Sequence, residues 1–213
     1  MEYFRFVDIL EFLGTFAFSI SGIRLASAKQ FDWFGAFVIG FATAVGGGTV
    51  RDVMLGLTPF WMINPIYIIS TGLALAVVIF YRKILIRHNY TIFTFDAVGL
   101  ALFTVVGIEK TLACGFPFWV AVIMGVITGC VGGIIRDVLI TEIPLIFRKE
   151  IYAFASIVGG FFYFVSDRIG MPADVTKVVA AIAVILTRVI AVRLQIGLPI
   201  LKGSEDEGAK GIE

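Results

Sequence analysis

The chain has 213 residues, of which 59% are hydrophobic and 15% are charged, and its mean hydropathy is +0.99. A soluble domain carries about a quarter charged residues and fewer than half apolar ones, so most of these apolar side chains must face something other than water. Disordered, fibrous and disulfide-rich classes are excluded, because they require polarity, short repeats or many cysteines. An all-α polytopic membrane protein remains, since the strands of a membrane barrel alternate apolar and polar residues.

Seven apolar stretches, separated by polar or proline-containing connections, predict seven transmembrane helices. They cover residues 7–28, 33–57, 64–82, 92–112, 117–140, 150–166 and 174–195. The polar tail from Lys202 is predicted to be disordered. Seven spans place the two termini on opposite sides of the membrane.

Lysine and arginine residues concentrate on one side of this predicted topology. The side with the first, third and fifth connections and the C-terminus holds nine of them: Arg24, Lys29, Arg82, Lys83, Arg87, Arg148, Lys149, Arg193 and Lys202. The other side holds four: Arg5, Lys110, Arg168 and Lys177. Because cytoplasmic loops carry the excess of basic residues, we expect an external N-terminus and a cytoplasmic C-terminus. Basic residues at the cytoplasmic surface also predict anionic lipids as partners.

An offset of 85 residues aligns the two halves of the chain without a gap. GGGTVRDVMLGLTP at residues 46–59 meets VGGIIRDVLITEIP at residues 131–144, and about a quarter of the positions over residues 8–67 are identical. Each copy holds three spans, so the second copy enters the membrane from the opposite face, which makes an inverted repeat. We expect one three-helix repeat over 1–91, an inverted one over 92–172, a seventh helix over 173–200 and a disordered cytoplasmic tail over 201–213.

The second span of each copy contains consecutive glycines followed by Arg-Asp. Each glycine weakens a helix by about 1 kcal/mol, so we expect the second and fifth helices to be kinked or broken there. Irregular backbone at membrane depth is tolerated where it is buried in protein or lines water, and intramembrane charges usually mark ion or substrate pathways. These segments are therefore predicted to line a permeation path near the midplane. The candidate residues are Thr43, Gly46, Gly47, Gly48, Arg51, Asp52, Thr128, Gly132, Gly133, Arg136 and Asp137.

A purely structural role is the alternative for these segments. The glycines would then allow close helix packing, and Arg51 would pair with Asp137 while Arg136 pairs with Asp52 across the pseudo-two-fold axis.

Other polar residues in the spans are weaker candidates. Glu11 and Asp96 occupy equivalent repeat positions near span starts, where carboxylates interact favourably with helix N-termini. Helical serine and threonine often bond back to their own backbone, so their contribution to a path is less certain. The weaker pore candidates of this kind are Thr15, Ser19, Ser21 and Thr104.

The sequence lacks a recognisable catalytic or metal-binding set. A P-loop requires a lysine after its glycines, and none follows these. His88 is the only histidine and is predicted to be a solvated loop residue, so it cannot complete a Ser–His–Asp or Cys–His arrangement. Cys114 and Cys130 are predicted to be small buried apolar residues without a disulfide. We expect a protein that is not an enzyme, uses no cofactor or metal and binds no nucleic acid.

The segment GGGTVRD and its echo VGGIIRD, in a chain of seven predicted spans, closely resemble the prokaryotic TRIC channels, the trimeric intracellular cation channels and their bacterial relatives. The resemblance covers about residues 5–197, and Val131 in place of a glycine is a slight departure. It implies a homotrimer in a prokaryotic plasma membrane, with one potassium-conducting pore inside each protomer. It assigns the glycines, arginines and aspartates of both segments to the second and fifth helices that line this pore. Permeating potassium and bound lipid are the ligands it implies.

Two other functions fit the sequence. Inverted repeats with broken helices also occur in secondary transporters. An arginine there can hold the carboxylate of a small zwitterionic substrate such as glycine, which some bacterial relatives are thought to move. A membrane scaffold without transport activity is the third hypothesis, and it accounts least well for charges inside the membrane.

Overall fold

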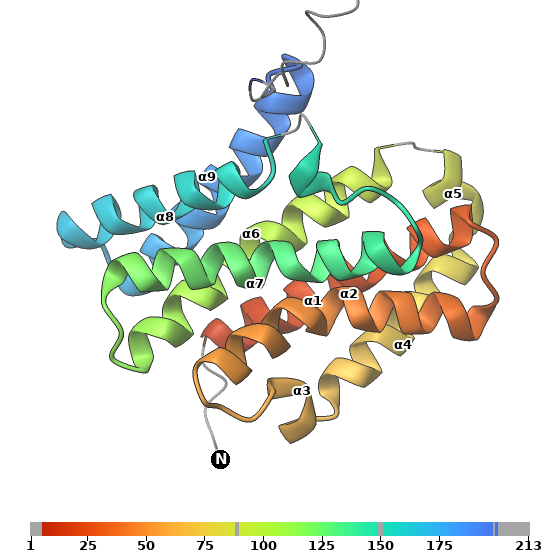
Figure 1. Cartoon of the computed structure of the whole chain (residues 1–213), viewed down its shortest axis with the longest axis horizontal. Coiled ribbons are helices and arrows are strands. Elements are labelled where there is room, and N and C mark those ends of the chain that lie inside the picture. The colour runs from red at the N-terminus through yellow and green to blue at the C-terminus, as the bar shows by residue number, and fades with distance from the viewer. Residues whose placement is uncertain (1–5, 88–89, 149–150, 198, 200–213) are drawn as a thin grey trace, which may run out of the picture.

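The computed structural model describes residues 6–87, 90–148, 151–197 and 199, and the regular elements of this part of the chain are helices (Figure 1). The predicted disordered tail over 201–213 and His88 lie outside the described residues. The elements are α1 Phe6–Ala28, α2 Trp33–Met54, α3 Phe60–Ile63, α4 Ile66–Phe80, α5 Arg82–Arg87, α6 Thr91–Ala113, α7 Phe118–Leu139, the 3-10 turn η1 Leu145–Phe147, α8 Ala153–Arg168 and α9 Ala173–Arg193.

Each predicted span coincides with a helix, although the lengths differ. Five helices are long and apolar enough to cross a membrane: α1, α2, α6, α7 and α9. The other two, α4 and α8, have 15 and 16 residues, fewer than the roughly 20 that span a bilayer at right angles. The predicted second span was too long, because α2 ends at Met54 and Gly56 follows with a φ of 71°. Its equivalent after α7, Thr141, has a φ of 59°.

Four helices, α1, α2, α6 and α7, form the centre of the molecule. α1 packs against α2, α4 and α6, whereas α7 packs against α2, α6 and α8. Between α1 and α6, the rings of Phe18 and Phe103 stack with centroids 5.5 Å apart. Each ring covers a glycine on the opposite helix, Gly99 and Gly14 respectively. α9 packs on α6 and α8, and its C-terminal end projects away from the other helices (Figure 1).

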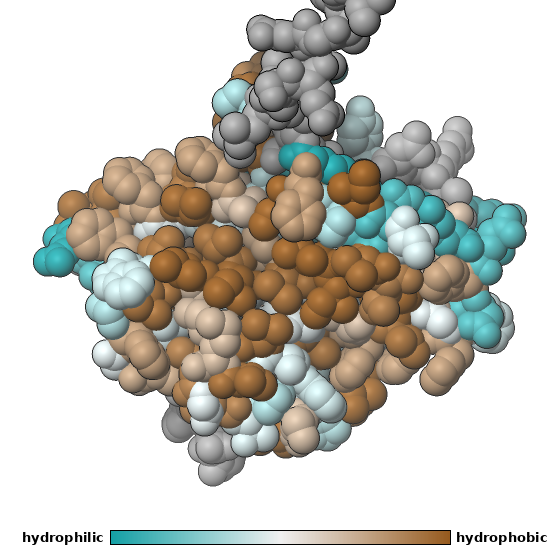
Figure 2. All heavy atoms as spheres, viewed as in Figure 1, coloured by the Kyte–Doolittle hydropathy of each residue, from teal (hydrophilic) through white to brown (hydrophobic). Residues whose placement is uncertain are grey.

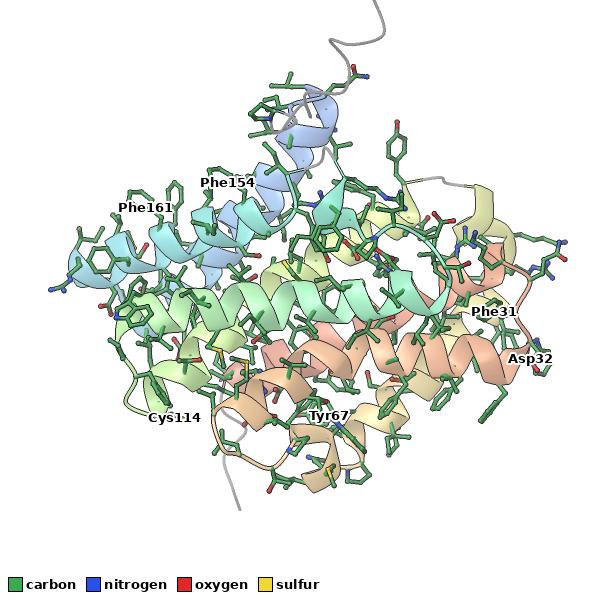
Figure 3. All side chains as sticks on the ribbon, viewed as in Figure 1. Phe31, Asp32, Tyr67, Cys114, Phe154 and Phe161 are labelled. Carbon is green, nitrogen blue, oxygen red and sulfur yellow. The ribbon has the colours of Figure 1, made fainter. Side chains whose placement is uncertain are left out.

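Large apolar side chains cover the outside. Figure 2 shows a broad apolar band across one face, with hydrophilic residues gathered toward its two ends. Phe154 and Phe161 of α8 point outward in Figure 3, and both are exposed. A soluble monomer rarely exposes contiguous apolar patches above a few hundred Å². An apolar exterior around buried charges is the arrangement expected of a protein whose solvent is lipid.

The glycines of α2 and α7 bring the two backbones into contact. A Cβ atom on Gly47 would lie 2.1 Å from the carbonyl oxygen of Thr128, and one on Gly132 would lie 2.2 Å from that of Thr43. Both helices continue unbroken through their glycines, so the prediction of broken helices is wrong for this structure. Tertiary packing outweighs the weak helix propensity of glycine here, as it commonly does.

Replacing Gly47 by Ala is expected to destabilise the protein, because the added methyl group overlaps a backbone oxygen that moves only if α7 moves. Overpacking of this kind typically costs about 1–3 kcal/mol. Gly72→Ala is the matched control, since no atom lies within 4 Å of the corresponding Cβ position in α4. Thermal unfolding of the purified protein in detergent compares the two. Equal unfolding midpoints would show that the crossing has room for a side chain.

Candidate functional site

The predicted Arg51–Asp52 pair lies in a buried ionic cluster with Glu11 of α1. Arg51 donates from Nε and Nη2 to Asp52 Oδ1 at 2.8 and 2.7 Å, and Nη2 also lies 3.2 Å from Glu11 Oε1. Asp52 Oδ2 accepts the backbone amide of Phe60 at 2.9 Å, so the same carboxylate holds the start of α3. Arg51 is fully buried, which makes these carboxylates its counter-ions.

Glu11 joins three other groups in this cluster. Lys110 Nζ lies 2.7 and 3.0 Å from its two carboxylate oxygens, and Tyr67 Oη donates to Oε2 at 3.0 Å. We call Glu11, Arg51, Asp52, Tyr67 and Lys110 the first cluster. Its two carboxylates balance its two cations.

A second cluster surrounds Arg136 in the other half of the chain. Arg136 donates from Nε to Asp137 Oδ1 at 2.8 Å and from Nη1 to Asp96 Oδ1 and Ser21 Oγ at 2.6 and 2.9 Å. Asp137 Oδ2 accepts the amide of Leu145 at 3.1 Å, which holds the start of η1.

Tyr152 completes this second cluster, because its hydroxyl lies against Gly133, one turn before Arg136. We define the second cluster as Ser21, Asp96, Arg136, Asp137 and Tyr152.

The two clusters are related by the 85-residue offset. In each, an arginine binds the aspartate that follows it and an acidic residue on the first helix of its own half. The aspartate that follows the arginine also accepts a hydrogen bond from the backbone amide eight residues further along the chain. The cross-pairing of Arg51 with Asp137 and of Arg136 with Asp52 is therefore a wrong prediction.

The geometry of the crossing explains this result. Gly47 meets Thr128 while Thr43 meets Gly132, so α2 and α7 run antiparallel where they touch. The two arginines consequently lie on opposite sides of the contact, about 18 Å apart along the helices at 1.5 Å per residue. Neither arginine can reach the aspartate of the other half.

Glu11 and Asp96 do not make the helix N-terminal interactions predicted for them, so that prediction is wrong. Each is buried and binds the arginine of its own half. The signal that identifies them is their equivalence under the offset. A search for identical residues at the offset does not detect this equivalence, because one residue is glutamate and the other is aspartate.

The predicted hydroxyl groups line the interior and bond first to their own helices. Thr43 and Thr128 each donate to the carbonyl four residues earlier at 2.6 Å, and Thr15 and Thr104 do so at 2.8 and 2.7 Å. Two further contacts recur at the offset and join helices: Ser19 with Thr71 at 3.0 Å, and Thr104 with Ser156 at 2.9 Å. The remaining candidate glycines face side chains, with Gly46 against Ile135 and Gly48 against the ring of Phe60.

One surface cavity connects with the first cluster. It has a volume of about 370 Å³ and includes Lys110, whose ammonium group binds Glu11. Three further charged residues line it, namely Glu109, Asp174 and Lys177. The first cluster thus reaches the surface at the end of the molecule where α1 begins and α6 ends.

Arg188 of α9 is a buried cation outside the two glycine–arginine–aspartate segments. Its Nη1 donates to the carbonyl of Ile151 at 3.0 Å, and its guanidinium lies 4.9 Å from the ring centre of Tyr152. It has no equivalent in the repeat, since α9 follows the second copy, so the offset gives no signal for it.

An exposed ion pair connects two loops outside the long helices. Lys29 Nζ, after α1, lies 2.6 Å from Glu142 Oε1, after α7, and Arg148 Nη2 lies 3.2 Å from the other carboxylate oxygen. Hydrogen bonding to Lys29 and its positive charge lower the pKa of Glu142 below its ordinary value. The connections after α1 and after α7 therefore lie at the same end of the molecule.

Helices with an apolar exterior, a glycine-mediated crossing and paired charges in the interior define an integral membrane protein of the class that includes channels and transporters. Residues 8–83 and 93–168 each match the family described as Glycine transporter, again 85 residues apart. A UPF0126 membrane protein of Vibrio cholerae is 39% identical over 194 residues, covering 90% of this chain and 81% of that protein. The UPF0126 inner membrane protein YadS of Escherichia coli K12 is 38% identical over 193 residues, 89% and 93% of the two chains.

Solved structures identify the fold of this family. The TRIC trimeric intracellular cation channel orthologue from Rhodobacter sphaeroides superimposes with a TM-score of 0.83 at 34% identity, over 89% of this chain and 98% of that one. A second structure, from work on conductance through TRIC cation channels, gives 0.82 at 34% identity over 92% and 98%. The chain belongs to the prokaryotic TRIC family, which confirms the resemblance of its two glycine–arginine–aspartate segments.

Replacing Glu11 by Gln is expected to destabilise the protein strongly, because Arg51 and Lys110 would then lie together with one carboxylate fewer. Removing one partner from a buried pair costs about 3–5 kcal/mol. The matched control is Glu142→Gln, which makes the same chemical change in an exposed pair and should alter stability little. Yield and the thermal unfolding midpoint measure both variants. A Glu11→Gln protein as stable as the control would contradict a structural role for the first cluster.

Proposed function

We propose that the chain is a monovalent cation channel that conducts chiefly potassium, with one pore inside each protomer of a homotrimer. The observation that carries this proposal is the likeness to solved TRIC cation channels, which extends over 98% of those chains at 34% identity. The UPF0126 inner membrane protein of E. coli, 38% identical, supports a bacterial inner-membrane location.

We assign the pathway to the interior between α2 and α7, with α1 and α6 behind them. Thr43, Gly47, Thr128 and Gly132 form its narrowest part, where the two backbones touch. The first and second clusters lie on either side of this crossing and supply carboxylate oxygens. Carboxylate oxygens are suitable ligands for potassium. The arginine and lysine side chains that pair with these carboxylates weaken their attraction for the ion, so that the ion can leave again. On this assignment the remaining candidates of the two segments lie beside the path, and Thr15, Ser19 and Thr104 contribute hydroxyl groups behind it.

We further propose seven spans arranged as two inverted three-helix repeats, 1–91 and 92–172, followed by a seventh helix over 173–200. The antiparallel crossing of α2 and α7, the recurrence of contacts at the offset and the double family match support this arrangement. Kinking of α2 and α7 at their glycines is the motion we propose for opening, since glycine lowers the cost of bending a helix.

A transporter of a small zwitterion such as glycine is the second candidate, and the description of the matching family favours it. Such a transporter needs a cation for the substrate carboxylate. Arg51 and Arg136 each already bind two carboxylates of the chain itself, so a substrate would have to displace one of them. This competition weighs against the transporter and leaves the channel as the proposed function.

Purified protein in planar lipid bilayers tests the function. We expect discrete unitary currents in symmetric potassium chloride, with a reversal potential in a gradient that follows the cation. Glycine uptake into proteoliposomes under matched conditions is the parallel measurement. Saturable glycine uptake without unitary currents would replace the channel with the transporter.

We propose an external N-terminus and a cytoplasmic C-terminus, with anionic lipid at the basic cytoplasmic surface. The excess of lysine and arginine supports this orientation, and the Lys29–Glu142 pair supports a shared side for the first and fifth connections. A reporter fused after Lys202 is expected to be active only if it functions in the cytoplasm. Labelling of a tag at that position by an impermeant reagent added outside the cell would reverse the orientation.

A further inference from the structure

One difference between the two clusters concerns a pair of groups that are equivalent under the offset. In the first cluster, Tyr67 Oη donates to Glu11 Oε2 at 3.0 Å. The equivalent groups in the second cluster are Tyr152 Oη and Asp96 Oδ2. Both of these atoms are buried and neither has a hydrogen-bond partner in the described chain. The direct bond of the first cluster is therefore missing from the second.

The difference in chain length between the two acids accounts for this loss. Aspartate is one methylene shorter than glutamate, which withdraws the carboxylate by about 1.5 Å. Asp96 Oδ1 is held at 2.6 Å by Arg136, so the carboxylate cannot swing toward Tyr152 without breaking that ion pair. Tyr152 is fixed as well, since its hydroxyl lies against Gly133 and its ring lies under the guanidinium of Arg188. One buried acceptor and one buried hydroxyl are thus left without a direct bond.

We infer that a buried water molecule bridges Tyr152 and Asp96 in the second cluster. Water accepts from the tyrosine hydroxyl and donates to the carboxylate, which satisfies both orphaned atoms. Buried waters in proteins typically occupy such positions, where two to four polar groups lack partners. Leaving both groups unsatisfied in a low-dielectric interior is unfavourable, most of all for a carboxylate oxygen. A neutral ligand also fits the charge, because Arg136 already binds Asp96 and the guanidinium of Arg188 lies over the ring of Tyr152.

The first cluster is closed to water at the same position by the direct Tyr67–Glu11 bond. The two clusters are therefore unequal at this position, with a direct bond in the first cluster and a bridging water in the second. That this water belongs to the ion pathway rests on the proposed channel function, whereas the water site itself does not.

A structure determined at a resolution that shows ordered water tests the site directly. We expect a density peak within hydrogen-bond distance of both Asp96 Oδ2 and Tyr152 Oη, and none between Glu11 and Tyr67. Soaking with thallium, a heavy stand-in for potassium, separates water from a bound cation by anomalous scattering. No anomalous signal is expected. A thallium peak at the site, or a direct bond between Asp96 and Tyr152, would overturn the inference.

Conservative variants test the site without a high-resolution structure. Tyr67→Phe removes a direct bond to a carboxylate and should lower the unfolding midpoint more than Tyr152→Phe, which removes one of the contacts of a water molecule. In an Asp96→Glu background the longer side chain replaces the water, and Tyr152→Phe should then be as costly as Tyr67→Phe. Equal effects of Tyr67→Phe and Tyr152→Phe on the unfolding midpoint of the unmodified chain would refute the inference. This comparison does not require the Asp96→Glu variant, so it remains decisive if that variant does not fold.

Unitary currents of Asp96→Glu connect the site to conduction. With the water expelled, we expect a severalfold lower conductance than in the unmodified channel and an unchanged sign of ion selectivity. Unchanged conductance in a variant shown to lack the water would remove the site from the pathway. An unmodified protein that carries no current would instead refute the proposed channel while leaving the density test intact.

Discussion

Two arginines buried in the interior of a membrane protein have to be neutralised, and the rest of this structure depends on how that is done. An unpaired charge at such a depth costs several kcal/mol. Arg51 and Arg136 are each held by the aspartate that follows them and by an acid from the first helix of the same half. These bonds tie α2 to α1 and α7 to α6. The aspartates in turn fix the backbone that leaves each helix, at Phe60 and Leu145.

Each arginine is neutralised by acids of its own half, and this leaves the α2–α7 contact free of charge. The Lys110–Glu11 ion pair also joins the two halves, but it lies at the contact of α1 with α6. Where α2 and α7 touch, the surfaces consist of glycine and of threonine whose hydroxyl is bound to its own helix. Ionic groups therefore lie on either side of the α2–α7 contact, which is itself nearly uncharged. On the proposed pathway, a permeating cation would meet carboxylate oxygens at both approaches and no charged group at the centre.

Much of this organisation could be predicted from the sequence, because polar identities in an apolar chain stand out against composition. The 85-residue offset identified both Arg-Asp pairs and the equivalence of Glu11 and Asp96. The partners could not be predicted, since the choice between pairing within and across halves depends on the direction of the α2–α7 crossing. The continuity of the two helices was also missed. Glycine propensity indicates where a helix is weak, but the packing partner that compensates for it lies on another helix, 81 residues away for Gly47 and 89 residues away for Gly132.

The contact of Gly47 with Thr128 and of Gly132 with Thr43 also restricts how the two helices can move. Side chains that interdigitate can slip past one another by changing rotamers, whereas two backbones in direct contact have no such freedom. Sliding of α2 along α7 would drive a carbonyl oxygen into the Cα atoms of the next turn. Rotation about the contact point, which changes the crossing angle of α2 and α7, keeps the two backbones at the same separation. The helix ends that carry the arginines lie about 9 Å from the contact at 1.5 Å per residue, so a rotation of about 10° would displace each arginine by about 1.5 Å.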